Sequence, residues 1–141
     1  MPFHKTDWND SKRGSAEDIV QADLQRSGLH RGLCTNIGIR FTRQEVEKYR
    51  VFGTNVDGIW TLQKGTLIYY LDGEEVHGKT RQDRRDRAID ACLRERGRTV
   101  IRYVYKPAIT KKARNEFLKL VETELKRLGY FNGEIIYDDG E

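Results

Sequence analysis

Acidic residues and a histidine gather in the middle of the chain, in a pattern that suits metal-assisted hydrolysis. Asp57 lies in the segment NVDGIW, Asp72 ends the apolar run GTLIYYLDG, and His77 follows in the next loop. Carboxylates are hard oxygen ligands that bind Mg²⁺ together with water and phosphate oxygens. A histidine beside such a site can take a proton from the attacking water. These are the parts that hydrolysis of a phosphodiester needs.

Two further carboxylates, Asp83 and Asp86, follow within an arginine-rich segment. A carboxylate next to a catalytic histidine holds its tautomer and stabilises the protonated ring, and the sequence leaves both aspartates open for that role. Each residue also has a structural interpretation, because Asp-Gly pairs are common in turns and helical Asp–Arg pairs are commonly surface ion pairs. The clustering of the whole set around one strand end favours the catalytic interpretation.

Two strands and a helix must position these residues. The segment YRVFGTNVDGIWTL mixes β-branched and aromatic residues, and 65–73 is a nearly continuous apolar run, typical of a strand covered on both faces. If these two strands form a hairpin, Asp57 and Asp72 approach one another near the same end. A helix predicted over 79–96 carries the aspartates and arginines that follow, and Gly97 ends it.

The remaining pattern predicts a mixed α/β domain with a small central sheet flanked by helices. The other predicted elements are helices over 15–27, 41–49 and 109–128 and a strand over 98–105. Ser15 and Thr42 are expected N-caps, with Glu45 closing a capping box, and Gly28 is expected to end the first helix. Residues 29–42 carry no clear pattern.

The predicted organisation is an irregular arm over 1–14, one domain over 15–130 and a tail over 131–141 that is either a short edge strand or disordered. Hydrophobic residues make up 37% of the 141 residues, so the core is small. With a mean hydropathy of −0.77, no apolar run approaches the ~20 residues that span a bilayer. The first residues also lack the apolar stretch of a signal peptide. We therefore expect a cytoplasmic protein with no membrane partner.

The quoted segments have a counterpart in a known family. The succession VDGIW, LDGEEVHG, RQDRRDRAIDACLRERG and TVIRYVY resembles the Vsr-like nucleases, which comprise the very short patch repair endonucleases and the EDxHD homing endonucleases. These belong to the PD-(D/E)xK restriction-endonuclease-like fold. Their pattern is a strand with a metal-binding Asp, a strand ending in Gly, three variable residues and His-Gly, an Arg-Asp-rich helix, a Gly and a strand with an Arg.

The resemblance implies a single restriction-endonuclease-like domain and a metal site. Asp57 would be the principal Mg²⁺ ligand, with Mn²⁺ as a substitute, and Asp72 would complete the site. The segment SAEDIVQADLQRSGL resembles the family's first helix, so Glu17 would lie near the metal or its waters. The alternative role of Glu17 is a favourable interaction with the dipole of its helix.

The resemblance also assigns the proton transfer. His77 would be the general base, and Asp83 would be its partner, with Asp86 as the rival for that position. The repair enzymes bind a structural zinc through Cys and His close to this loop. Here Glu74 and Glu75 follow the glycine, and Cys34 and Cys92 each stand alone, so no structural zinc is expected. The same differences weaken the case for T:G mismatch repair.

The leading hypothesis is therefore a magnesium-dependent endonuclease acting on double-stranded DNA. The chain carries 26 Lys and Arg against 22 Asp and Glu, and five cations follow His77, namely Lys79, Arg81, Arg84, Arg85 and Arg87. These side chains would hold the DNA backbone, although a charge run is commonly just a solvated helix face.

Three alternatives stay open, namely a nuclease for nicked, mismatched or branched DNA, an inactive nucleic-acid-binding module on the same fold, and an interaction protein with solubilising helices. Three aromatic residues, Phe3, Trp8 and Trp60, are candidates to wedge into a base stack. Of these, Trp60 is assigned to the core.

Overall fold

A computed structural model describes residues 5–73, 80–105, 109–130 and 135–136. Within these ranges, the side chains described are those of residues 16–72, 83–105 and 109–130. In chain order the elements are α1 (Lys5–Arg26), β1 (Leu33–Arg40), α2 (Arg43–Tyr49), β2 (Gly53–Leu62), β3 (Gly65–Gly73), α3 (Thr80–Glu95), β4 (Arg98–Tyr105), α4 (Lys111–Arg127) and β5 (Ile135–Ile136). The mixed α/β fold expected from the sequence is confirmed.

The strands form one mixed sheet in the order β1-β2-β3-β4. The first two pairings are antiparallel, whereas β3 and β4 are parallel and are connected through α3. Parallel neighbours need such a crossover, because the chain must return to the same end of the sheet. The two residues of β5 pair with the end of β2, so the strand alternative for the tail is confirmed there.

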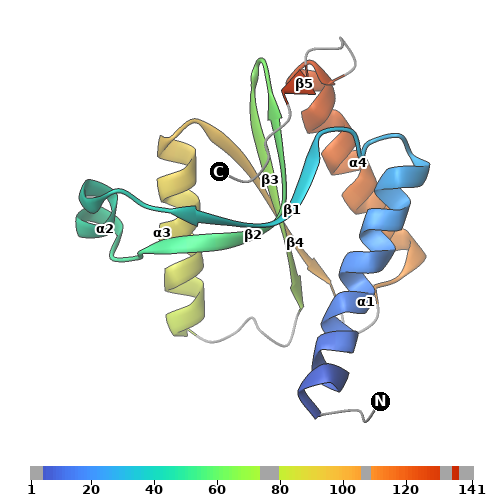
Figure 1. Ribbon diagram of the computed structural model, residues 1–141, viewed down its shortest axis with the longest axis horizontal. Helices are drawn as coiled ribbons and strands as arrows, with labels where there is room; N and C mark the ends of the chain where they lie inside the picture. Colours follow the sequence, from blue (N-terminus) through green and yellow to red (C-terminus); the bar gives the residue numbers. More distant parts are fainter. Residues whose placement is uncertain (1–4, 74–79, 106–108, 131–134, 137–141) are drawn as a thin grey trace.

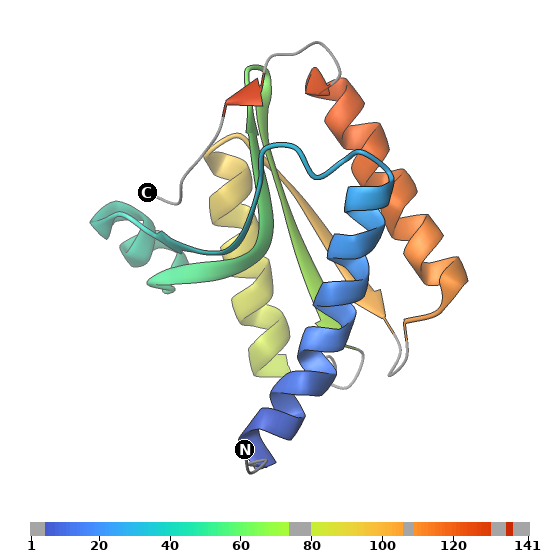
Figure 2. The same cartoon turned by 45° about the vertical axis from the view of Figure 1, so that its right-hand side comes forward.

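Helices cover both faces of this sheet, with α1 and α4 on one side and α3 with α2 on the other (Figure 1). The turned view in Figure 2 shows α1 and α4 lying next to one another. Each face has its own core. The first core contains Val20, Leu24, Trp60, Tyr69, Phe117 and Val121. The second contains Val56, Ile59, Ile68, Tyr70, Ile89 and Leu93. Trp60 is fully buried, as the sequence predicted.

The β1–β2 ladder is interrupted at one position. It runs from Leu33↔Trp60 to Thr35↔Gly58 and resumes at Ile37↔Val56. Asn36 and Asp57 lie opposite one another in the interruption, and Asn36 has a left-handed φ of 54°. Since side chains alternate between the two faces of a strand, this interruption changes the face that each strand presents. Trp60 faces the α1/α4 core, whereas Val56 faces the α3 core.

The beginning of the chain departs from the expectation. α1 begins at Lys5 rather than at Ser15, so the predicted irregular arm over 1–14 is wrong for 5–14 and Ser15 is not an N-cap. The sequence contains no proline between Pro2 and Pro107, so nothing removes a backbone N–H from this segment. Gly14 inside the helix costs only about 1 kcal/mol relative to alanine, which packing of the later turns offsets.

Other boundaries follow the local signals. Gly28, at φ 72°, ends α1 as expected. Thr42 caps α2 in a complete capping box with Glu45, and the unassigned segment 29–42 supplies β1. β2 begins only at Gly53, because Arg50 adopts a left-handed conformation that ends α2 first. Within the described residues, no helix combines the length and the apolar run that crossing a membrane requires.

Glu45 also connects α2 to α3. Arg96 donates to it through Nε at 2.7 Å and Nη2 at 2.5 Å, and the Cys92 thiol donates at 3.3 Å. The hydrogen bond from Arg96 outweighs the cost of burial and holds the pKa of Glu45 well below its usual value. Burial and the neighbouring Glu45 raise the pKa of Cys92 to about 11, so this cysteine stays a neutral thiol.

We expect Glu45→Gln to lower the free energy of unfolding by about 1.5–3 kcal/mol at neutral pH, the range for hydrogen bonds to charged groups. The folded-state pKa of Glu45 lies below the usual 4.5. The contribution is therefore complete above pH 4.5 and is lost as the pH falls toward the folded-state value. Urea unfolding at pH 7 and pH 3 measures the difference. The exposed Glu47, 3.7 Å from Arg43, provides the control Glu47→Gln, with little effect at either pH. If Glu45→Gln lowers the free energy of unfolding as much at pH 3 as at pH 7, the stabilising role of the ionised Glu45 carboxylate is wrong.

Candidate active site

Asp57 occupies the point where β2 and β3 separate. Their pairing extends from Leu62↔Gly65 to Gly58↔Tyr69 and stops there. One residue further along β2, the Asp57 carboxylate accepts a hydrogen bond from the backbone N–H of Leu71 at 2.7 Å. A side-chain oxygen thus takes the place of a ladder carbonyl. Because that N–H is held by β3, the carboxylate has a fixed position at the edge of the opening.

Gly58, the residue after Asp57, lets a tyrosine ring pack against the backbone of β2. A Cβ atom at Gly58 would stand 2.0 Å from the Cε2 atom of Tyr69, so no other residue fits under the ring. Tyr69 is 1% exposed, and its ring centroid lies 5.2 Å from Phe117 and 5.6 Å from Trp60. The phenol is therefore held by close packing on several sides.

The charges of Glu17 and Asp57 both act on the Tyr69 phenol. Burial raises the pKa of the Tyr69 phenol, and the negative charges of Asp57 and Glu17 raise it further. Glu17 is half-buried on α1, the helix that crosses this end of the sheet (Figure 2). Two of the predicted site residues, from elements far apart in the chain, thus both lie within electrostatic range of one phenol, which remains protonated.

Asp72 is engaged on the opposite face. The Nη1 atom of Arg102 donates to it at 3.1 Å, and Nε donates to both oxygens of Asp90 at 2.9 and 2.8 Å. Nη2 of the same arginine lies 3.7 Å from Asp86. The guanidinium also stacks 4.0 Å from the centre of the Tyr70 ring. One arginine of β4 therefore gathers carboxylates from the end of β3 and from two turns of α3.

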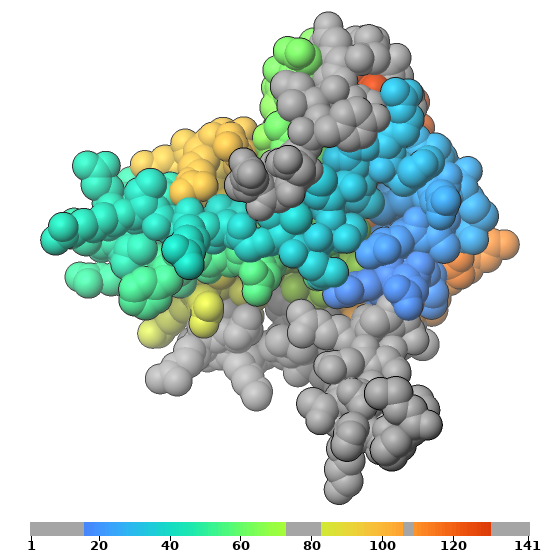
Figure 3. All heavy atoms as spheres, in the orientation of Figure 1, coloured from blue at the N-terminus to red at the C-terminus, as the bar shows by residue number. Residues whose placement is uncertain are grey.

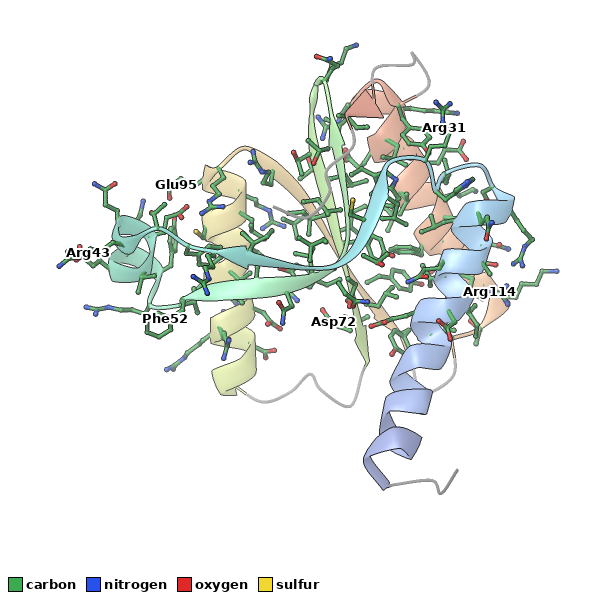
Figure 4. The ribbon with its side chains drawn as sticks, viewed as in Figure 1. Arg31, Arg43, Phe52, Asp72, Glu95 and Arg114 are labelled. Atoms are coloured by element: carbon green, nitrogen blue, oxygen red, sulfur yellow. The ribbon has the colours of Figure 1, made fainter. Side chains whose placement is uncertain are left out.

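This cluster is mostly buried. The Arg102 side chain is 17% exposed and its carboxylate partners at most 18%. Burial by itself would lower the pKa of the guanidinium, but the hydrogen bond and charge of Asp90, with the charges of Asp72 and Asp86, raise it above its usual value. Arg102 is permanently charged and compensates part of the acidic charge around Asp72, which is labelled in Figure 4.

The expected approach of Asp57 to Asp72 is therefore seen only in part. Asp57 contacts the backbone of the preceding residue, Leu71, but the Asp72 side chain pairs with Arg102. Alternation along β3 puts Tyr70 with the α3 core and Tyr69 with the α1/α4 core, and Asp72 follows Tyr70 to Arg102. Its role as a metal ligand stays a prediction. Asp86 is also engaged by Arg102, whereas Asp83 lies half-buried in the first turn of α3. Neither has a described contact with a histidine.

Several predicted residues lie outside the described part of the structure. His77 and Lys79 belong to the segment 74–79, and the side chain of Arg81 is likewise not described. The three later cations of the predicted DNA-binding set, Arg84, Arg85 and Arg87, are all exposed on α3. Their exposure leaves them accessible to an anionic partner.

The described residues fit Mg²⁺ through a small number of carboxylates. Among the side chains that the structure describes, no group of three or more His, Cys, Asp or Glu is arranged to hold a metal ion. Mg²⁺ commonly keeps several waters and binds one or two carboxylates together with substrate phosphates. Asp57 and Glu17 match that requirement, and the fixed orientation of Asp57 suits a ligand.

Sequence reasoning missed the residues that organise this site. The resemblance includes an arginine in the strand TVIRYVY, which is Arg102, but it assigns no partners to that side chain, although a buried charge needs them. No feature of the sequence distinguishes Tyr69 from the apolar residues around it. Comparison with known proteins adds nothing here, because no family model, no curated protein and no solved structure matches the chain.

We expect Arg102→Met to lower the free energy of unfolding by about 3–5 kcal/mol, because it leaves buried carboxylates without their cation. Chemical denaturation measures the change. The double variant Arg102→Met/Asp90→Asn should recover part of the loss, since it also removes one unpaired charge. Arg127→Met is the matched control, because its pair with Glu124 is exposed and should contribute no more than about 1 kcal/mol. Equal losses in both arginine variants would refute the buried network.

Proposed function

We propose that this protein is a magnesium-dependent endonuclease that hydrolyses phosphodiester bonds in double-stranded DNA. The observation that carries the proposal is the fixed carboxylate of Asp57 where β2 and β3 separate, with Glu17 in the same neighbourhood. Support also comes from the order β2, β3, α3, β4. It places the motifs that resemble the Vsr-like nucleases on strand, strand, helix and strand, as that family's pattern requires.

Asp57 and Glu17 would hold the metal ion. Bound there, Mg²⁺ would polarise the scissile phosphate and lower the pKa of a coordinated water. The Leu71 N–H keeps the Asp57 carboxylate oriented, and the Tyr69 phenol, kept protonated by burial and by both carboxylates, is a hydrogen-bond donor rather than a base. His77 would take the proton from the attacking water, as the resemblance implies.

The arginines of α3 would bind the DNA backbone. Arg84, Arg85 and Arg87 are exposed and lie on the helix that follows the His77 segment. Each guanidinium that neutralises a phosphate releases counterions, so binding would weaken steeply as salt is added. This term is independent of sequence and orients the duplex without selecting a site.

One observation favours a second candidate, a nucleic-acid-binding module without hydrolytic activity. Asp72 forms an ion pair with Arg102, an interaction that competes with metal binding by this carboxylate. The two candidates differ in a single measurable property, which is metal-dependent cleavage. Nicking of supercoiled plasmid with Mg²⁺, Mn²⁺ or EDTA separates them, and cleavage that disappears in EDTA supports the endonuclease.

We expect Asp57→Asn to abolish plasmid nicking while DNA binding is unchanged or stronger. The amide oxygen still accepts from Leu71, so the fold is preserved, but the negative charge that binds the metal and repels DNA is gone. Glu17→Gln should also reduce the rate, whereas its exposed neighbour in Asp18→Asn provides a matched control with wild-type nicking. Wild-type cleavage by Asp57→Asn would show that the metal is bound elsewhere.

His77→Ala should reduce the cleavage rate by roughly 10²–10⁴-fold, the usual contribution of a positioned general base. The wild-type rate should rise with pH through the region near about 6.5, where an ordinary histidine loses its proton, and the variant should lose that rise. Asp83→Asn should be less damaging than His77→Ala if Asp83 only orients the ring. Single-turnover cleavage from pH 5 to pH 9 measures both effects. An unchanged rate and pH profile in His77→Ala would assign the base to another group.

A further inference from the structure

A groove of about 380 Å³ lies between the end of α2, the start of β2 and the exposed side of α3. Its lining residues are Tyr49, Arg50, Val51, Phe52, Arg84, Arg85 and Ala88. The α2 and early β2 segment forms one end of the molecule (Figure 3), so the groove opens on the surface. It lies on the α3 side of the sheet, whereas Glu17 and the Tyr69 ring belong to the other side.

The groove has a uniform charge. Arg50, Arg84 and Arg85 line it, and no carboxylate is among the described residues that do so. Elsewhere on the described surface, some cations have acidic partners, such as Lys48 with Glu95 at 3.0 Å. A guanidinium binds phosphate through two parallel hydrogen bonds. The lining is therefore complementary to an anion with apolar parts.

Phe52 supplies the apolar part. It is 81% exposed, whereas Phe41 is 8% exposed and Phe117 is fully buried. Figure 4 shows its side chain directed away from the start of β2 toward the outside of the molecule. Val51, which is 8% exposed, and Ala88 form an apolar floor beside it. An aromatic ring held in the open next to arginines is the arrangement that binds nucleobases, with stacking on the ring and phosphates on the cations.

We propose that this groove binds an unpaired nucleotide of a DNA strand, with its base stacked on Phe52 and its flanking phosphates on Arg84 and Arg85. The inference rests on the proposed function for the identity of the strand as DNA. In a paired duplex the bases already stack on one another, and an inserted side chain must first separate them at a cost. An unpaired base meets no such cost, so the groove selects a single-stranded overhang or flap next to the duplex.

The position of the groove on α3 connects it to the candidate active site. Arg84 and Arg85 lie between Asp83 and Asp86 on the same helical turn, and Asp86 contacts Arg102 at the sheet. In this proposal, a duplex bound where β2 and β3 separate continues as a single strand toward the outer side of α3. The proposed groove sets the form of the substrate, and the carboxylates act on the duplex beside it.

The test measures binding in EDTA, so that it does not depend on cleavage. Fluorescence anisotropy compares a blunt duplex with the same duplex carrying a single-stranded thymidine overhang or an abasic overhang of equal length. We expect the wild type to bind the thymidine overhang about 5- to 150-fold more tightly than the abasic one, which is the range for stacking of one base on an aromatic ring. Phe52→Ala should remove this preference and leave blunt-duplex affinity unchanged.

Matched variants separate the two halves of the groove. Arg84→Ala and Arg85→Ala should each reduce the salt dependence of overhang binding by up to about one phosphate contact while the thymidine preference persists. Leu120→Ala removes another exposed apolar side chain, 48% exposed on α4, and should change neither quantity. Equal binding of the two overhangs by the wild type, or a preference that survives Phe52→Ala, would overturn the inference.

The outcomes also distinguish this inference from the proposed function. A preference for the thymidine overhang that depends on Phe52, without magnesium-dependent nicking, would support the nucleotide-binding groove and refute the endonuclease proposal. Nicking that depends on Asp57, without any preference for the thymidine overhang, would support the endonuclease proposal and refute the nucleotide-binding groove. Polyglutamate that binds as tightly as the overhang, with the same dependence on Phe52, would identify an acidic-peptide site instead and would overturn the assignment to nucleotides.

Discussion

The hydrogen bond between the Leu71 N–H and the Asp57 carboxylate is the interaction around which this end of the molecule is arranged. Where two strands separate, a backbone N–H that loses its ladder partner must be satisfied in another way. Here an acidic side chain satisfies it, and the same bond fixes the acid. The interruption of the β1–β2 ladder opposite Asn36 makes the separation possible, because it turns β2 away from the direction that β3 follows.

Arg102 divides the acidic residues of this region into two groups. Asp72, Asp86 and Asp90 surround its guanidinium on the α3 side. The charge of Glu17 acts on Tyr69 on the other side, and the charge of Asp57, at the separation of the strands, acts on both Tyr69 and Tyr70. Without the arginine, carboxylates from β3 and α3 would repel one another in a half-buried place. The arginine thus pairs with the carboxylates on the α3 side, and Asp57 and Glu17 are the proposed metal ligands.

The two helical layers have different roles in this arrangement. α1 and α4 are held together through Asp23, which accepts from Arg114 at 2.7 Å, and they fix the Tyr69 ring against Phe117. On the other side, Glu45 and Arg96 join α2 to α3 and thereby place Phe52 and the arginines of α3 along one groove. The layer of α1 and α4 thus positions the proposed metal ligands, and the layer of α2 and α3 carries the proposed DNA contacts.

The sequence alone determined the features that depend on neighbouring residues. The capping box of Thr42 and Glu45, the apolar strand 65–73 and the alternating strand 98–105 were readable because caps and periodicity are local. The tertiary structure decided what depends on pairing between distant segments. It placed Glu17 and Asp57 within electrostatic range of Tyr69 and paired Asp72 with Arg102. It also left Phe52 exposed. The change of face along β1 and β2 follows from the interruption at Asn36 and Asp57, and no local pattern announces where a ladder between distant segments will break.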